Sequence, residues 1–121
     1  MTTGGERRIL RHGTTRQRAE AILKDGPNPN FVEPGSSLRA KGFSTSDVQG
    51  PYAVGSPEQY AAGKASLFPT EGGPAILEVE VPKEIANLAT DVGGEVRFEP
   101  GSGLRELLDS WPDLPKRILL P

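Results

Sequence analysis

The only histidine of the chain, His12, lies in the run Arg11, His12, Gly13, Thr14, Thr15, between a short apolar segment and a predicted helix. A side chain at such a junction lies beside the unpaired amide groups of a helix N-terminus, which bind anions. Glycine allows a ligand close to the backbone, and the threonine hydroxyls can donate and accept hydrogen bonds. The run predicts either a contact with an anionic ligand or an ordinary helix cap beside a surface histidine. Local features alone favour the cap.

Glu95 is a second candidate, because it directly follows two glycines and begins a segment of alternating polar and apolar residues. A period of two places Glu95, Arg97 and Glu99 on one face of a strand. A carboxylate at the start of a strand, next to two glycines, can lie in a cleft. The alternative is a solvated strand face, which we expect for Arg97 and Glu99. Glu95 is not expected to be a core contact, so its replacement should change stability little.

The aromatic candidates are Tyr60 and Tyr52. Tyr60 belongs to a predicted helix with small neighbours, where a tyrosine can stack on a planar ring. A tyrosine in such a helix is more often part of the core. Tyr52, in the preceding loop, competes for the same role. Ser44, in the hydroxyl-rich segment 42–46, adds a further polar group.

The elements that must position these residues follow from capping residues and hydrophobic spacing. A first helix is predicted with Thr14 as its N-cap and Gly26 as its end, and a second begins at a capping box on Ser56. Strand patterns without long crossovers indicate an α+β fold rather than a doubly wound parallel sheet. Strands are predicted over 9–10, 42–46, 75–81, 95–99 and 118–120, and further helices over 83–88 and 104–111.

The length and composition of the chain limit the functions that it can have. A length of 121 residues fits one domain, 1–121, of which residues 1–8 are expected to be flexible. The formal net charge of −2 disfavours general nucleic-acid binding. The absence of cysteine excludes disulfides and thiol catalysis, and one histidine leaves almost no ligands for zinc. No signal peptide or apolar span is recognised, so a cytoplasmic location without membrane contact is the default expectation.

The order of these motifs resembles the ADP-ribosyltransferase superfamily, in particular the branch with a histidine, tyrosine and glutamate triad shared by diphtheria-type toxins and poly-ADP-ribose polymerases. The match covers His12 to about Ser102. It is carried by short motifs, which are Arg11-His12-Gly13-Thr14-Thr15, Gly42-Phe43-Ser44-Thr45-Ser46, an alanine-rich helix with a tyrosine, Ile76 to Pro82, and Glu95-Val96-Arg97-Phe98.

The resemblance implies a split, bent antiparallel β-sheet with short flanking helices and NAD, as substrate, in the cleft between its halves. It implies NAD-dependent ADP-ribosyl transfer or NAD glycohydrolysis by a toxin-like effector with an unknown protein or nucleic-acid acceptor. His12 would contact the adenosine-side ribose and the Gly13 backbone the nicotinamide amide. Tyr60 would stack on nicotinamide, and Glu95 would contact the nicotinamide-side ribose. The implied catalytic residues are Glu95, His12 and Tyr60, and the implied NAD-binding residues are Arg11, His12, Gly13, Thr14, Ser44 and Tyr60.

Alternatives stay open at this point. The Ser44-Thr45-Ser46 segment also resembles the Ser-Thr-Ser motif of the other major branch, in which Arg11 would take the role given to His12. Tyr52 remains an alternative to Tyr60. An RNA 2′-phosphotransferase-like enzyme and a non-catalytic nucleotide-binding or protein-interaction module would both use the same scaffold.

Overall fold

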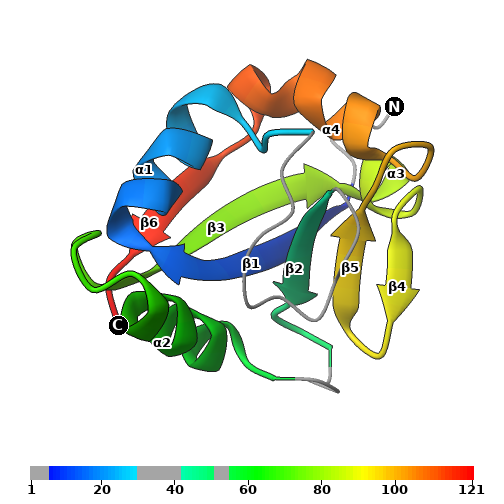
Figure 1. Cartoon of the computed structure of the whole chain (residues 1–121). Helices are drawn as coiled ribbons and strands as arrows, with labels where there is room; N and C mark the ends of the chain where they lie inside the picture. The colour runs from blue at the N-terminus through cyan, green and yellow to red at the C-terminus, as the bar shows by residue number, and fades with distance from the viewer. Residues whose placement is uncertain (1–5, 30–41, 51–54) are drawn as a thin grey trace.

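Strands β1 (Arg7–Thr15) and β3 (Pro74–Pro82) pair along their whole length in antiparallel register, from Arg7 opposite Pro82 to Thr15 opposite Pro74. They form the centre of the computed structural model, which describes residues 6–29, 42–50 and 55–121 (Figure 1). The alternation of apolar and acidic residues correctly predicted β3. β1 is longer than predicted, because pairing with β3 keeps its polar half extended. Arg7 and Arg8, expected in a flexible segment, belong to β1.

Four further strands complete one antiparallel sheet in the order β4-β5-β2-β1-β3-β6. The strand β2 (Phe43–Asp47) joins β1 to β5 (Glu95–Phe98), and β6 (Lys116–Leu119) forms the edge beside β3. The other edge is β4 (Thr90–Val92), which was not predicted because its residues are all exposed. The mixed α+β class and the antiparallel sheet are confirmed.

Helices α1 (Arg16–Asp25) and α2 (Pro57–Leu67) begin at side-chain caps. Ser56 caps α2 through the predicted capping box, and Gly26 ends α1 as predicted. The N-cap of α1 is Thr15 rather than Thr14, because β1 runs through Thr14 and buries it completely. The remaining helical elements are α3 (Lys83–Ala86), α4 (Leu104–Ser110) and the 3₁₀ turn η1 (Trp111–Asp113).

The main core lies between the sheet and the helices α1 and α4, and α2 lies on the opposite side (Figure 1). Residues at every second position of β1 and β3 point toward α1 and α4, as the period of a strand requires. They include Leu10, Leu77 and Val79, which are almost completely buried. The other face of β1 and β3 packs against α2, so neighbouring residues of β1 face two different layers.

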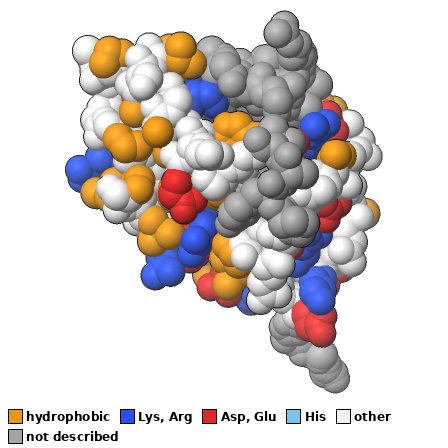
Figure 2. All heavy atoms as spheres, turned by 90° about the horizontal axis from the view of Figure 1, so that it is seen from below, with side chains coloured by type: hydrophobic (Ala, Val, Ile, Leu, Met, Phe, Trp, Pro, Cys, Tyr) orange, Lys and Arg blue, Asp and Glu red, His pale blue; other side chains and the backbone are white. Residues whose placement is uncertain are grey.

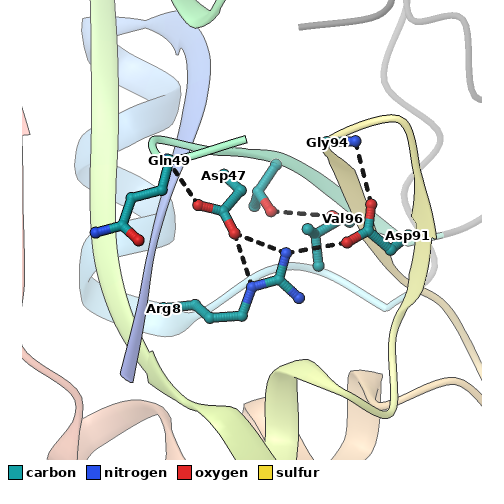
Figure 3. Close-up of polar contacts among 7 residues, drawn as sticks. Arg8, Asp47, Gln49, Asp91, Gly94 and Val96 are labelled. Atoms are coloured by element: carbon teal, nitrogen blue, oxygen red, sulfur yellow. Dashed lines mark hydrogen bonds and ion pairs between the residues drawn. The ribbon is translucent and has the colours of Figure 1, made fainter. Parts of the chain in front are cut away.

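Arg8 ties three strands together at one end of the sheet (Figure 3). Its Nε donates to Asp47 Oδ2 on β2 over 2.8 Å, and its Nη2 donates to Asp91 Oδ2 on β4 over 3.0 Å. Burial by itself lowers the pKa of Arg8, but the hydrogen bonds to both carboxylates outweigh it and raise the pKa. The cation therefore holds β1, β2 and β4 in register at this end.

One face of the molecule carries mixed charges. Among the described residues on the face shown in Figure 2, basic and acidic side chains are interspersed with apolar ones. Over the residues that the structure describes, no helix is long and apolar enough to cross a membrane.

Candidate functional site

β1 and β2 separate beyond the end that Arg8 holds. Both strands are fully described, and their register pairs are Leu10 opposite Asp47 and Arg11 opposite Ser46. β1 nevertheless continues to Thr15. In Figure 1, β2 runs at a steep angle to β1. The sheet therefore opens at His12, which is the next residue of β1.

The His12 side chain lies at this opening. Its Nδ1 is 2.6 Å from the carbonyl oxygen of Ser44 on β2. A carbonyl can only accept, so Nδ1 donates this hydrogen bond. The ring also lies against Phe43, with 4.6 Å between the ring centroids. His12 is thus held in one orientation by the strand on the other side of the opening.

A narrow pocket opens here between β1, β2, β5 and α2. It brings together the three predicted catalytic residues His12, Tyr60 and Glu95, which lie on three different elements. Of the predicted NAD-binding residues, Thr14 is completely buried and does not line the pocket. The lining residues are Arg11, His12, Gly13, Ser44, Thr45, Ser46, Tyr60, Lys64 and Glu95.

The Glu95 carboxylate is buried in this pocket, with 7% of the residue exposed. Its Oε2 accepts a hydrogen bond from Ser44 Oγ over 2.8 Å, and its Oε1 accepts from Arg97 Nε over 2.9 Å. The expectation that Glu95 makes no core contact was therefore wrong. Arg97, expected on a solvated face, is its ion-pair partner. The pairing register of β2 with β5 sets Ser44 opposite Arg97 and so next to Glu95.

Helix α2 supplies Tyr60 and Lys64. Its buried residues are Pro57, Ala61 and Lys64, which lie at the spacing of one helical face. This face can approach β1 closely because Gly13 has no side chain. A Cβ on Gly13 would lie 2.0 Å from the carbonyl oxygen of Pro57 and 2.8 Å from the Ala61 nitrogen. Lys64 was missed by sequence reasoning, although a lysine in the apolar stripe of a helix is itself a signal.

A second, wider hollow adjoins the pocket on the α1 side of the sheet. It is lined by residues of α1, by the segment after it, and by Gly42 and Phe43. His12 lines both hollows. The histidine at the opening of the sheet therefore lies between a polar pocket with a carboxylate and a more apolar hollow.

Arg11 also lines the pocket, but its guanidinium is bound to Glu78 on β3 through Nε over 3.0 Å. Arg117 of β6 binds the other oxygen of this carboxylate over 2.7 Å. Partial burial by itself raises the pKa of Glu78, but the hydrogen bonds from Arg117 and Arg11 and their charges outweigh it and lower the pKa. Glu78 thus holds Arg11 along the sheet, whereas His12 points into the opening.

No protein-family model, curated protein or solved structure matches this chain. The resemblance carried by the short motifs therefore remains a prediction. Tyr52, the competing aromatic residue, lies outside the described residues.

Proposed function

We propose that the chain binds NAD and cleaves the bond between nicotinamide and ribose, transferring ADP-ribose to an acceptor or to water. The observation that carries this proposal is the convergence of His12, Tyr60 and Glu95 on one pocket from β1, α2 and β5. A histidine can hydrogen-bond to a ribose, and an aromatic side chain can stack on a planar base. A buried carboxylate can stabilise a cation that forms on that ribose.

Glu95 is the proposed catalytic residue. When the glycosidic bond breaks, its electron pair leaves with nicotinamide, whose ring nitrogen becomes neutral, and the ribose becomes an oxocarbenium-like cation. A fixed carboxylate beside the ribose stabilises this cation and accepts a hydrogen bond from the 2′-hydroxyl. The acceptor or water then forms the new bond to the same carbon and loses a proton. Burial of Glu95 supports this role, because charges interact more strongly away from water.

His12, Gly13 and Tyr60 are proposed to hold the substrate. The close packing of Gly13 against α2 brings Tyr60 over the pocket, where its ring would stack on nicotinamide. His12 lies between the two hollows, so a dinucleotide that occupied both would pass its ring. The His12 side chain is then the group to meet the adenosine-side ribose. The ion pair of Arg11 with Glu78 favours His12 over Arg11 in this role.

The decisive experiment compares Glu95→Gln with wild type for release of nicotinamide from NAD, measured by chromatography. We expect kcat to fall about 10²-fold or more, with a smaller change in KM, because a group that stabilises developing charge acts in the transition state. Glu99→Gln is the matched control, since Glu99 directly follows the same strand but does not line the pocket. The control should turn over like wild type.

Stability must be measured alongside activity. Loss of the Glu95 charge leaves Arg97 without its ion-pair partner. We therefore expect the free energy of unfolding of Glu95→Gln to be about 1–3 kcal/mol lower than that of wild type. Assays are therefore run well below the midpoint of thermal unfolding. Equal turnover by Glu95→Gln and wild type would refute the role of Glu95. Wild type that binds NAD by calorimetry and never cleaves it would be a non-catalytic nucleotide-binding module.

A further inference from the structure

The two oxygens of the Glu95 carboxylate are engaged unequally. Oε1 is 2.9 Å from both Nε and Nη2 of Arg97, whereas Oε2 accepts a single hydrogen bond from Ser44 Oγ. A carboxylate oxygen offers about two acceptor positions. Arg97 therefore fills Oε1, and one position on Oε2 remains for a hydroxyl of a ligand.

We infer that Arg97 is a positioning residue for Glu95, which fixes the carboxylate so that Oε2 faces the ribose of the substrate. The inference rests on the proposed function. Arg97 and Glu95 are two residues apart on β5 and project from the same face. Arg97 does not line the pocket, so it acts on the substrate only through Glu95.

The ion pair has two opposing effects on the reaction. It neutralises part of the charge that would stabilise the ribose cation, and it restricts the carboxylate to one orientation. The Glu95 side chain is 8% exposed and that of Arg97 is 25% exposed, so water screens the pair less than a surface pair. Because the remaining acceptor position belongs to one oxygen only, orientation is the effect that decides the rate.

This assignment separates Arg97 from a purely structural residue. Arg97→Gln should lower kcat about tenfold and leave KM almost unchanged, since misorientation of a catalytic group is felt mainly in the transition state. Arg97→Lys should recover part of this loss, because an ammonium keeps the charge but cannot place two fixed donors on one oxygen. A structural residue would instead lower the fraction of folded protein and leave kcat per folded molecule unchanged.

The test measures nicotinamide release by wild type, Arg97→Gln, Arg97→Lys and the control Arg117→Gln. Arg117 is also ion-paired across the sheet, but it is bound to Glu78 and does not line the pocket. Its variant should keep the kcat of wild type. Independently of activity, NMR follows the Arg97 Nε–H resonance, which should be protected from exchange in wild type and exposed in Glu95→Gln.

The outcomes distinguish the two proposals. Arg97→Gln that turns over as fast as active wild type, or faster, would overturn the positioning role and leave the proposed function intact. Loss of Arg97 Nε–H protection on addition of NAD would overturn it as well, because the substrate would then displace Arg97 from Oε1. Wild type that neither binds nor cleaves NAD would overturn the proposed function, and this inference with it.

Discussion

Gly13→Ala is expected to force β1 and α2 apart. The added methyl group would lie 2.0 Å from the Pro57 carbonyl oxygen, 2.8 Å from the Ala61 nitrogen and 3.0 Å from the Pro57 carbonyl carbon. The shortest of these is more than about 1 Å below a normal contact distance. All three atoms belong to the backbone of α2, so no side chain can rotate away. The helix must move as a unit or the strand must bend.

Overpacking of a core costs about 1–3 kcal/mol, and a rigid obstruction places Gly13→Ala at the upper end, near 3 kcal/mol. Gly63→Ala is the matched control on α2. A Cβ at Gly63 meets nothing within 4 Å, and alanine in an exposed helix interior gains about 0.5–1 kcal/mol over glycine. The two variants should therefore differ by about 4 kcal/mol in the free energy of unfolding, although each adds the same methyl group.

Urea unfolding followed by tryptophan fluorescence measures both variants, because Trp111 is the only tryptophan and is buried. In a chain of this size, 3 kcal/mol lowers Tm by roughly 10 °C or more. Gly13→Ala that unfolds at the same urea concentration as Gly63→Ala would refute the close packing of α2 on β1. It would also remove the argument that Gly13 brings Tyr60 to the pocket.

Two further predictions concern the ligand and the pH. If Tyr60 stacks on nicotinamide, Tyr60→Ala should weaken NAD binding in calorimetry by about 1 kcal/mol or more, while Tyr52→Ala binds like wild type; the reverse result would transfer the role to Tyr52. Because the pKa of Glu78 is lowered in the folded chain, its ion pairs stabilise the fold fully above the ordinary carboxyl pKa of about 4.5, and this stabilisation is lost as the pH falls through the lower folded value. Urea unfolding should show Glu78→Gln less stable than wild type at pH 7, with a smaller difference at pH 3, and a difference that does not depend on pH would contradict this.

Local signals in the sequence determined the elements whose cause lies within a few residues. The capping box at Ser56 and the glycine stop at Gly26 were correctly predicted, because caps depend on neighbouring backbone groups. The alternation of apolar and acidic residues was also sufficient to predict β3. The strand β4 had a usable signal, since Gly93 and Gly94 have positive φ values of 60° and 93° and form the two-residue turn of a hairpin.

Other features depend on partners far along the chain. The polar half of β1 has no strand pattern of its own, and its backbone bonds to β3 decide its conformation and move the helix cap to Thr15. The burial of Glu95 follows from contact with Ser44, 51 residues earlier. No local pattern in the sequence indicates which residues of two strands will lie opposite each other, because strand register sets this pairing.

The sequence by itself offered His12, Tyr60 and Glu95 as candidates. Local features alone favoured a helix cap for His12 and a core position for Tyr60, and it was the order of the motifs along the chain that selected all three. Only the tertiary structure decided that they share a pocket and that Thr14 does not line it. The physical reason is the opening between β1 and β2. Arg8 holds these strands together at one end, and beyond Arg11 they separate, so the His12 ring reaches the carbonyl of Ser44 on the opposite strand.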